Sequence, residues 1–472
     1  MKLNTKRTIL VGLAFMAISA FWQLYDNVVP LLLKYDFGLE ESVSGYIMAA
    51  DNVLALFMLP FFGALSDKTR SRWGKRTPYI FFGTVFAVVF MIILPASVGF
   101  PFSKSTKLII FMVVLFLTLF SMATYRSPAV SLMPDVTPKP LRSKGNAIIN
   151  LMGTVGGMIT LVSMMVLDKT KYSAICPNDG SEVGGLGSGA HLVNCPECGQ
   201  DFVVTKLLRE NPSYVLLFSV IAGVMLIALA VLLFTVKENA FTREREDTEK
   251  EYGIADVEEN EGAPSSGKLP RPVLKSLVFI LLSVAFWYMG YNAVTSALSR
   301  YMVEVWHLGD SGTASCLMVA MGAALIAFVP IGIISSKIGR KKVILAGAML
   351  LALMFGAAYF FTEYVFSVNL VFVLVGVAWA AINVNSFPMV VEMSRGSNIG
   401  KYTGYYYAFS MAAQVLTPII SGYLLQISYR LLFPYAAAFV ALSFVTMLFV
   451  KHGDSKPLPP KKGIEAFADE EM

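Results

Sequence analysis

The chain has 472 residues, of which 56% are hydrophobic and only 15% are charged, and its formal net charge is +6. A soluble domain carries about 25% charged residues, so this composition excludes an ordinary soluble protein and indicates a chain that crosses a membrane many times. The sequence contains three histidines and no recognisable nucleophile arrangement, so it does not favour an enzyme.

Apolar runs long enough to cross a hydrocarbon core of about 30 Å recur along the whole chain. We expect each run to be a helix, because strands do not supply apolar runs of this length. Twelve helices are expected, near residues 8–33, 43–65, 77–98, 108–131, 146–167, 213–236, 273–299, 313–335, 343–361, 367–390, 402–426 and 431–450. The sequence therefore predicts an all-α protein of the lipid bilayer with twelve transmembrane helices.

The short loops on alternate sides of these helices differ in basic charge. Loops that share a side with the N-terminus hold 17 Lys and Arg residues, whereas the opposite short loops hold 5. Because basic loops stay in the cytoplasm, we expect a multi-pass protein of the cell membrane with both termini in the cytoplasm. The positive net charge then reflects this topology, and no nucleic-acid partner is expected.

A polar stretch at 237–271 separates two six-helix halves, which span 1–236 and 272–451. It is charged and rich in Gly, Pro and Ser, which is typical of a solvated linker. The end of the chain, 452–472, has a similar composition and is expected to be a cytoplasmic tail.

The two halves share sequence motifs at a nearly constant spacing. The motif "FWQLYDNVV" from Phe21 matches "FWYMGYNAV" from Phe286, 265 residues later. The loop "GALSDKTRSRWGKR" from Gly63 matches "GIISSKIGRKK" from Gly332, 269 residues later. This pattern indicates a duplicated six-helix unit, and transporters built in this way place the substrate between the halves, near the midplane.

The segment "GALSDKTRSRWGKRTPYI" resembles the cytoplasmic signature of the major facilitator superfamily, in the form found in glycoside–pentoside–hexuronide:cation symporters and sucrose carriers. The segments "YRSPAVSLMPDVTPKPLRSKGNA" and "GKYTGYYYAFSMAAQVLTPIISGYLL" strengthen the resemblance. It implies the major facilitator fold with two six-helix pseudo-repeats. It also implies that Asp67, Arg72, Lys75 and Arg76 form a gate latch; alternatively, these charges only enforce the topology.

Two acidic residues lie inside the predicted helices 1 and 2 at nearly the same depth. Asp26 is seven residues, or roughly 10 Å, from the outer end of helix 1, and Asp51 is eight residues, or roughly 12 Å, from that of helix 2. Two close carboxylates could share a proton or bracket a cation, so both are candidates for ion coupling, with Asn27 and Asn52 beside them. Alternatively, each acid only fixes helix packing.

The resemblance also bears on the ion site. When Pro60 and Gly63 are aligned with melibiose-permease-like members, their two cation-binding aspartates fall on Ala55 and Leu59. The sodium site of those relatives is therefore absent as such. Asp51 stands one turn further out, where it is either a relocated site or none.

Arg126 lies about five residues from the predicted cytoplasmic end of helix 4, where melibiose-permease-like members carry a sugar-binding aspartate. A guanidinium there could donate to sugar hydroxyls or to a carboxylate. It could equally snorkel to the cytoplasm or pair with Asp135 or Glu392.

Further candidate ligands follow from the resemblance, because helices 1, 4, 7 and 10 line the cavity in this superfamily. A sugar ring has polar edges and apolar faces, so amide and aromatic side chains on these helices are candidates, with ordinary packing as the alternative. They are Trp22, Gln23, Tyr25, Asn27, Tyr125, Trp287, Tyr291, Asn292, Trp379, Asn383 and Asn385.

The outer loop 168–212 contains the related segments "CPNDGSE" and "CPECGQD". Cys176, Asp179, Cys195 and Cys198 could bind a structural Zn²⁺, with His191 as a substitute ligand. The alternative is a disulfide, which the outer side favours. Cys316, inside helix 8, is expected to be a packing residue.

The sequence thus predicts a monomeric secondary transporter that takes up a saccharide with H⁺ or Na⁺ and needs no cofactor for transport. Two alternatives are a proton-coupled exporter of drugs or metabolites and an uncoupled lipid or metabolite carrier. The substrate, the ion and the direction of transport stay open at this point.

Overall fold

The computed structural model describes residues 4–454, except 139–141, 168–170, 187–191, 204–207, 211–212, 252–270, 392 and 394–398. Twelve helices in this part of the chain are long and apolar enough to cross a membrane, as predicted. They are α1 Thr5–Leu31, α2 Glu41–Lys68, α3 Thr77–Ala96, α4 Lys104–Val136, α5 Arg142–Leu167, α6 Val215–Thr235, α8 Arg271–Trp306, α9 Asp310–Ile338, α10 Arg340–Ala358, α11 Val368–Val391, α12 Ile399–Ile427 and α13 Leu432–Leu448.

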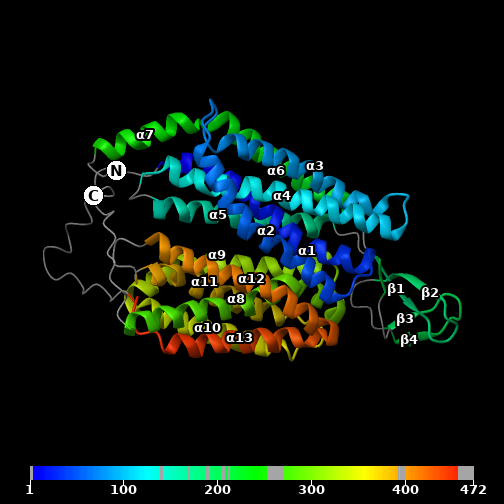
Figure 1. Cartoon of the computed structure of the whole chain (residues 1–472). Helices are drawn as coiled ribbons and strands as arrows, with labels where there is room; N and C mark the ends of the chain where they lie inside the picture. Colours follow the sequence, from blue (N-terminus) through cyan, green and yellow to red (C-terminus); the bar gives the residue numbers. More distant parts are fainter. Residues whose placement is uncertain are drawn as a thin grey trace.

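Each half has its own hydrophobic core, one formed mainly by α1–α6 and the other by α8–α13. We call these the N half and the C half. They meet where α2 packs against α12, α5 against α9 and α1 against α8 (Figure 1). Glycines permit the closest of these approaches: a Cβ on Gly45 would lie 2.3 Å from the backbone oxygen of Pro418, and one on Gly422 would lie 2.7 Å from that of Glu41.

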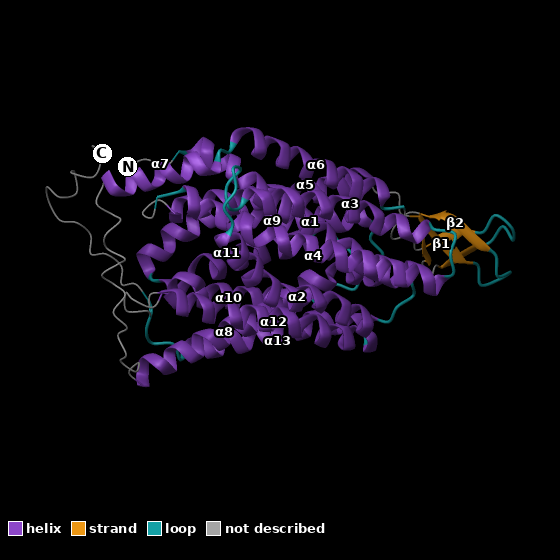
Figure 2. Ribbon diagram, turned by 45° about the horizontal axis from the view of Figure 1, so that its top comes forward, coloured by secondary structure: helices purple, strands orange, loops and turns teal. Residues whose placement is uncertain are grey.

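The two ends of the helix bundle differ in what they carry. At one end, five short strands lie between α5 and α6 (Figures 1 and 2): β1 Lys171–Ile175, β2 Glu182–Leu186, β3 Leu192–Asn194, β4 Asp201–Val203 and β5 Leu208–Glu210. They form antiparallel sheets in the orders β2-β1-β5 and β3-β4. We call this part the ribbon. The ribbon end and the opposite α7 end are named after these elements.

The first part of the predicted linker is helical, because residues Glu238–Glu251 form the helix α7. Its first residue, Glu238, is only 2% exposed. Arg7 of α1 contacts two residues of α7. Its guanidinium lies 2.7 Å from a carboxylate oxygen of Glu244 and 3.9 Å from the centre of the Phe241 ring. This part of the stretch therefore packs against the N half.

Several helices extend beyond the predicted ends, which moves the candidate residues deeper into the bundle. A π-helical turn at Leu32–Asp36 continues α1, and α4 runs through two prolines as far as Val136. Asp26 therefore lies ten residues from the ribbon end of its helix, and Asp51 lies ten residues from the start of α2. Arg126 is ten residues inside α4 rather than about five, which corrects the prediction for its depth.

Candidate functional site

The two predicted acids and the predicted arginine gather in the middle of the N half. Asp26 of α1 and Asp51 of α2 lie within electrostatic range of each other, and Arg126 of α4 attracts both carboxylates. The Asn52 amide donates a hydrogen bond of 2.8 Å to Asp51 Oδ1. All four side chains keep part of their surface accessible. This places two carboxylates and one guanidinium together, ten residues into their helices.

Arg126 also lies beside an aromatic ring, because its guanidinium carbon is 5.4 Å from the centre of the Trp22 ring. Tyr407 of α12, in the C half, is within electrostatic range of the same guanidinium. The proposed pairing with Asp135 is wrong, since that carboxylate binds Lys75 and Arg76 instead. The other proposed partner, Glu392, lies outside the described residues.

The C half contributes an aromatic wall on α8 and α11. Tyr291 and Trp379 stack in parallel, with ring centres 3.7 Å apart and planes 4° apart, and Tyr288 meets the same tryptophan edge-on. The side-chain nitrogen of Asn292, the residue after Tyr291 on α8, is buried without a hydrogen-bond partner among the described residues. Asn383 is exposed on α11. A parallel aromatic stack offers a flat apolar face of the kind that packs on a sugar ring.

Four other predicted ligands are engaged in contacts within their own half of the bundle. The Tyr125 hydroxyl donates to the Ala14 carbonyl at 2.5 Å, and Trp287 is completely buried in the core of the C half. The Asn27 and Asn385 side chains donate to carbonyls of their own helices, at 2.7 and 2.9 Å.

Tyr25 and Gln23 have different surroundings on α1. Tyr25 is 2% exposed and stacks on Phe21, with ring centres 6.0 Å apart. Gln23 is half-buried and faces α5, where its Oε1 lies 3.5 Å from the place that a Cβ on Gly157 would take. The Tyr25 hydroxyl is buried without a hydrogen-bond partner among the described residues, within electrostatic range of Asp26 and Asp51. Tyr25 and Gln23 therefore both stay candidates.

Two tyrosines that the sequence reasoning missed extend the aromatic wall onto α12. Tyr406 shares a hydrogen bond of 3.0 Å with Ser386, and the Phe387 ring contacts both Tyr406 and Tyr407. The sequence signal was the run "GYYYAF", in which three successive tyrosines occur within a predicted membrane helix.

A network of charged side chains joins the halves at the ribbon end. Arg300 of α8, only 2% exposed, donates to the carboxylate of Glu41 at the start of α2, and the Tyr429 hydroxyl donates to the same carboxylate. Lys34 Nζ lies 2.7 Å from Glu304 Oε1 and 3.2 Å from Glu41 Oε1. Lys34 and Glu41 belong to the N half and the other three residues to the C half, so the network closes this end. We call it the ribbon-end lock.

In the sequence, Lys34 and Arg300 are two of the five basic residues in the short loops opposite the N-terminus, and no motif marks Glu41 or Glu304. The available signal was a charged residue at the end of a predicted helix. It does not identify partners, because Arg300 and Glu41 are 259 residues apart in the chain.

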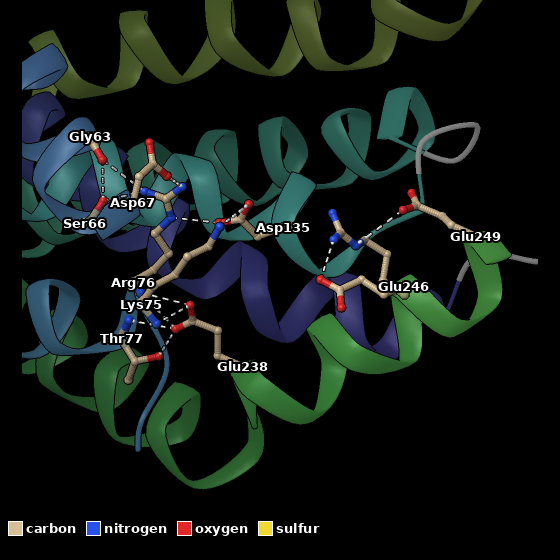
Figure 3. Close-up of polar contacts among 11 residues, drawn as sticks. Gly63, Ser66, Asp67, Lys75, Arg76, Thr77, Asp135, Glu238, Glu246 and Glu249 are labelled. Carbon is tan, nitrogen blue, oxygen red and sulfur yellow. Dashed lines mark hydrogen bonds and ion pairs between the residues drawn. The ribbon is translucent and has the colours of Figure 1, made fainter. Parts of the chain in front are cut away.

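The predicted latch residues lie at the α7 end, where Arg76 is the centre (Figure 3). Its buried guanidinium binds Asp67 and Ser66, and its Nε lies 2.7 Å from Asp135 Oδ2. Lys75 Nζ lies 3.1 Å from the other oxygen of Asp135. These contacts join α2, α3 and α4 within the N half.

Glu238 of α7 completes this cluster by capping α3. Its carboxylate accepts hydrogen bonds from the backbone N–H groups of Lys75, Arg76 and Thr77, at 2.8 to 3.1 Å, and from the Thr77 hydroxyl at 2.7 Å. The remaining latch candidate, Arg72, is exposed and contributes its backbone carbonyl, which accepts from Asn239. The C half repeats the arrangement, since Asp454 accepts from the N–H groups of Arg340 and Lys341. Between described residues, the polar contacts at this end stay within one half.

The four predicted metal ligands come together in the ribbon. The ligand atoms of Cys176, Asp179, Cys195 and Cys198 all lie within 4.8 Å of one another. Hydrogen bonds from Ser181 hold the pKa of Asp179 well below its ordinary value. The Cys198 backbone N–H lowers the pKa of Cys195, whereas burial raises the pKa of Cys176 to about 11.

Two further cysteine-loop predictions have different outcomes. His191 lies outside the described residues. Cys316 is completely buried in α9, where it contributes to the core of the C half, as expected of a packing residue.

Comparisons with known proteins agree with this architecture. A sequence profile described as "MFS/sugar transport protein" matches residues 10–450. The isoprimeverose transporter of Lactiplantibacillus pentosus is 23% identical over 345 residues, which cover 72% of this chain and 59% of the relative. The uncharacterized MFS-type transporter MJ1317 of Methanocaldococcus jannaschii is 28% identical over 200 residues, or 40% of this chain and 49% of the relative. The matched regions thus span only about half of these curated relatives.

Solved structures share the fold at low sequence identity. The xylose transporter XylE from E. coli, in an inward-open conformation, has a TM-score of 0.61 and 15% identity, with 98% of both chains covered. A proton-dependent oligopeptide transporter has a TM-score of 0.64 and 13% identity, with 95% of this chain and 98% of that chain covered. These relatives are transporters rather than enzymes. With its profile match over nearly the whole length, the chain is a multi-pass membrane protein that belongs to the MFS/sugar transport family.

Proposed function

We propose that this protein carries a saccharide into the cell together with one proton per cycle, by alternating access between its halves. The observation that carries the proposal is the arrangement around the midplane: an acid pair with Arg126 in the N half, and the stacked Tyr291 and Trp379 in the C half. The names of two relatives, an isoprimeverose transporter and a sucrose transport protein from Arabidopsis thaliana, support a saccharide as the substrate.

The charges of the acid cluster support one cation per cycle. Two carboxylates and one guanidinium sum to one negative charge when all are ionised, so a single bound cation makes the cluster neutral. Closing the cavity around a neutral cluster costs less hydration free energy than closing it around a charged one, because burying an unpaired charge in the membrane is unfavourable. We favour a proton over Na⁺, since Na⁺ needs several oxygen ligands and the amide of Asn52 already donates to Asp51.

The sugar would lie between the two halves, with hydroxyls toward Arg126 and Gln23 and a ring face toward Trp379. The planar guanidinium suits paired hydroxyl oxygens, and the aromatic ring suits the apolar C–H face. Tyr407 of α12 would add a hydroxyl from the C half, within electrostatic range of Arg126. Binding would thus depend on both halves, which is what a carrier that closes around its substrate requires.

We further propose that the α7 end faces the cytoplasm and that the ribbon is outside. The basic charge of the loops at the α7 end supports this orientation. In it, the ribbon-end lock closes the outer side. The arrangement then corresponds to a carrier that has closed behind its substrate and opens inward.

Transport by purified protein in proteoliposomes tests the proposal. We would screen mono- and disaccharides, including isoprimeverose and sucrose, while the pH and Na⁺ gradients are varied independently. We expect sugar-dependent alkalinisation of the external medium and uptake that follows the proton gradient. Asp51→Asn should abolish accumulation but retain sugar exchange, and Asp247→Asn, on the exposed face of α7, is the matched control.

Other outcomes separate the alternatives. Uptake that follows Na⁺ at constant pH overturns the choice of ion. If no saccharide moves or raises the thermal stability, the sugar proposal fails and a proton-coupled exporter takes its place. Sugar flux that does not follow the proton or Na⁺ gradient and is unchanged in an Asp26→Asn, Asp51→Asn double variant indicates an uncoupled carrier.

A further inference from the structure

The ribbon contains two turns with the same backbone geometry. In the first, Gly180 N–H donates to the Cys176 carbonyl at 2.9 Å, and Cys176 N–H donates to the Ser181 carbonyl at 2.8 Å. In the second, Gly199 N–H donates to the Cys195 carbonyl at 2.8 Å, and Cys195 N–H donates to the Gln200 carbonyl at 3.0 Å.

The position of the turning glycine also repeats. Gly180 has φ +74° and Gly199 has φ +69°, a conformation that favours glycine. Each turn therefore presents its first cysteine and the residue three positions later, Asp179 or Cys198, on the same side. Two such knuckles facing each other supply four ligands from two hairpins, which is the arrangement of structural zinc sites.

The distances between ligand atoms fit a tetrahedral ion. With Zn–S of about 2.3 Å and Zn–O of about 2.1 Å, a tetrahedron has S···S edges of about 3.8 Å and S···O edges of about 3.6 Å. The Sγ atoms of Cys176 and Cys198 are 3.7 Å apart, and Cys195 Sγ lies 3.5 Å from Asp179 Oδ2. Two different edges of the cluster therefore have the required length.

The surroundings of Asp179 orient one oxygen toward the cysteines. Ser181 donates from its backbone N–H and from its hydroxyl to Oδ1, at 2.9 and 2.6 Å. The other oxygen, Oδ2, faces Cys195 Sγ. Such hydrogen bonds to the second oxygen of a carboxylate are the usual support of a metal ligand.

The ribbon also needs a cross-link for its stability. Its buried core among the described residues consists of Ala174, Cys176, Val183, Cys195 and Phe202, and so small an apolar core does not normally hold a fold by itself. A disulfide would use two of the three ribbon thiols and leave the third without a partner beside Asp179. A metal ion uses all four side chains.

We propose that Cys176, Asp179, Cys195 and Cys198 bind Zn²⁺ tetrahedrally and that this ion holds the ribbon against the outer face of the C half. The second part rests on contacts that cross between the halves. The Tyr172 hydroxyl, on β1, donates to the Leu308 carbonyl at 2.9 Å, and Tyr214 donates to Asp310 at 2.8 Å. Tyr172 lies four residues before the ligand Cys176, so the metal fixes the strand that makes the contact.

The metal content of the full-length protein tests the site. We expect one Zn²⁺ per chain after purification, and a thiolate-to-cobalt charge-transfer absorption after replacement by Co²⁺. After denaturation with a chelator and without reductant, all four cysteines should titrate as free thiols. Protein with no bound metal and only two free thiols overturns the site and assigns a disulfide.

Single substitutions should change the affinity for Zn²⁺ in different directions while the protein stays folded. Ser181→Ala removes the support of Asp179 and should weaken Zn²⁺ binding about 10- to 100-fold. Asp179→Cys should bind Zn²⁺ more tightly than the native chain, because it restores two complete C-x-x-C pairs. Cys316→Ala is the control and should bind as the native chain does. Equal affinity in all these variants overturns the assignment of the ligands.

Hydrogen exchange tests the contact with the C half. Removing the metal should raise the exchange of backbone amides around Leu308, and Tyr172→Phe should do so with the metal still bound. If exchange around Leu308 does not change in either case, the ribbon does not brace the C half. This outcome does not bear on the proposed transport, which is measured separately.

Discussion

The ribbon-end lock predicts that Arg300→Met opens this end of the bundle. The change removes the cation from a buried pair and leaves the Glu41 carboxylate, whose side chain is only 8% exposed, without its main partner. Removing one member of a buried ion pair is destabilising by about 3–5 kcal/mol. Only the closed form suffers this loss, because water hydrates the carboxylate once the halves separate. The ratio of closed to open forms should then fall roughly 10²- to 4 × 10³-fold.

Single-molecule energy transfer across the ribbon end measures this ratio. Fluorophores attached through unnatural amino acids at Phe102 and Phe366, which are 53% and 85% exposed, report the separation of the halves and spare the native cysteines. Arg300→Met should shift the population to the longer distance. Adding Glu41→Gln should partly restore the closed form, since a buried charge that only Lys34 still pairs is then gone.

The control is Glu244→Gln, which breaks the exposed pair with Arg7 inside the N half. Exposed pairs contribute only about 0–1 kcal/mol, so the distance distribution should stay as in the native chain. The account of the lock is refuted if Arg300→Met leaves the distance distribution unchanged. It is also refuted if adding Glu41→Gln to Arg300→Met does not return any of the population to the shorter distance.

Three further predictions concern other contacts. Gly45→Leu should separate α2 from α12 and block transport while sugar binding persists, whereas Gly223→Leu, where a Cβ meets nothing within 4 Å, should transport normally. Glu238→Gln should lower the thermal midpoint in detergent, because loss of a helix cap is destabilising by about 0.5–2 kcal/mol, and Asp247→Asn should not. Trp379→Ala should weaken sugar binding in a thermal-shift titration about 2- to 12-fold, from an aromatic contribution of about 0.5–1.5 kcal/mol. Trp379→Phe should lose less.

Residue patterns within a single helix predicted the architecture well. The twelve helices and their grouping into two halves followed from apolar length and from the repeated motifs around Phe21 and Phe286. The closeness of Asp26 and Asp51 followed from their nearly equal distances to one short loop. Each of these predictions rests on residues in one helix or in two consecutive helices, or on motifs that recur at the spacing of a duplication.

Contacts between distant parts of the chain were not predictable in the same way. The cap that Glu238 provides is 161 residues from Thr77 in the chain, and nothing in the charged stretch around it indicated a buried carboxylate. The depth of Arg126 was underestimated because α4 continues through Pro128 and Pro134, which usually mark a helix end. Neighbouring helices compensate for such breaks in a membrane bundle, and a sequence window does not contain them.

The number of charges moved with each sugar tests the central claim most directly. In the proposed mechanism the acid cluster of Asp26, Asp51 and Arg126 takes up one cation, so the reversal potential of sugar-driven current in proteoliposomes should give one positive charge per sugar. At 100 mV this charge contributes about 2.3 kcal/mol, and a tenfold proton gradient adds about 1.4 kcal/mol. The account predicts a ratio of one that Asp51→Asn abolishes. A sugar flux with no coupled charge, or two charges per sugar, contradicts it.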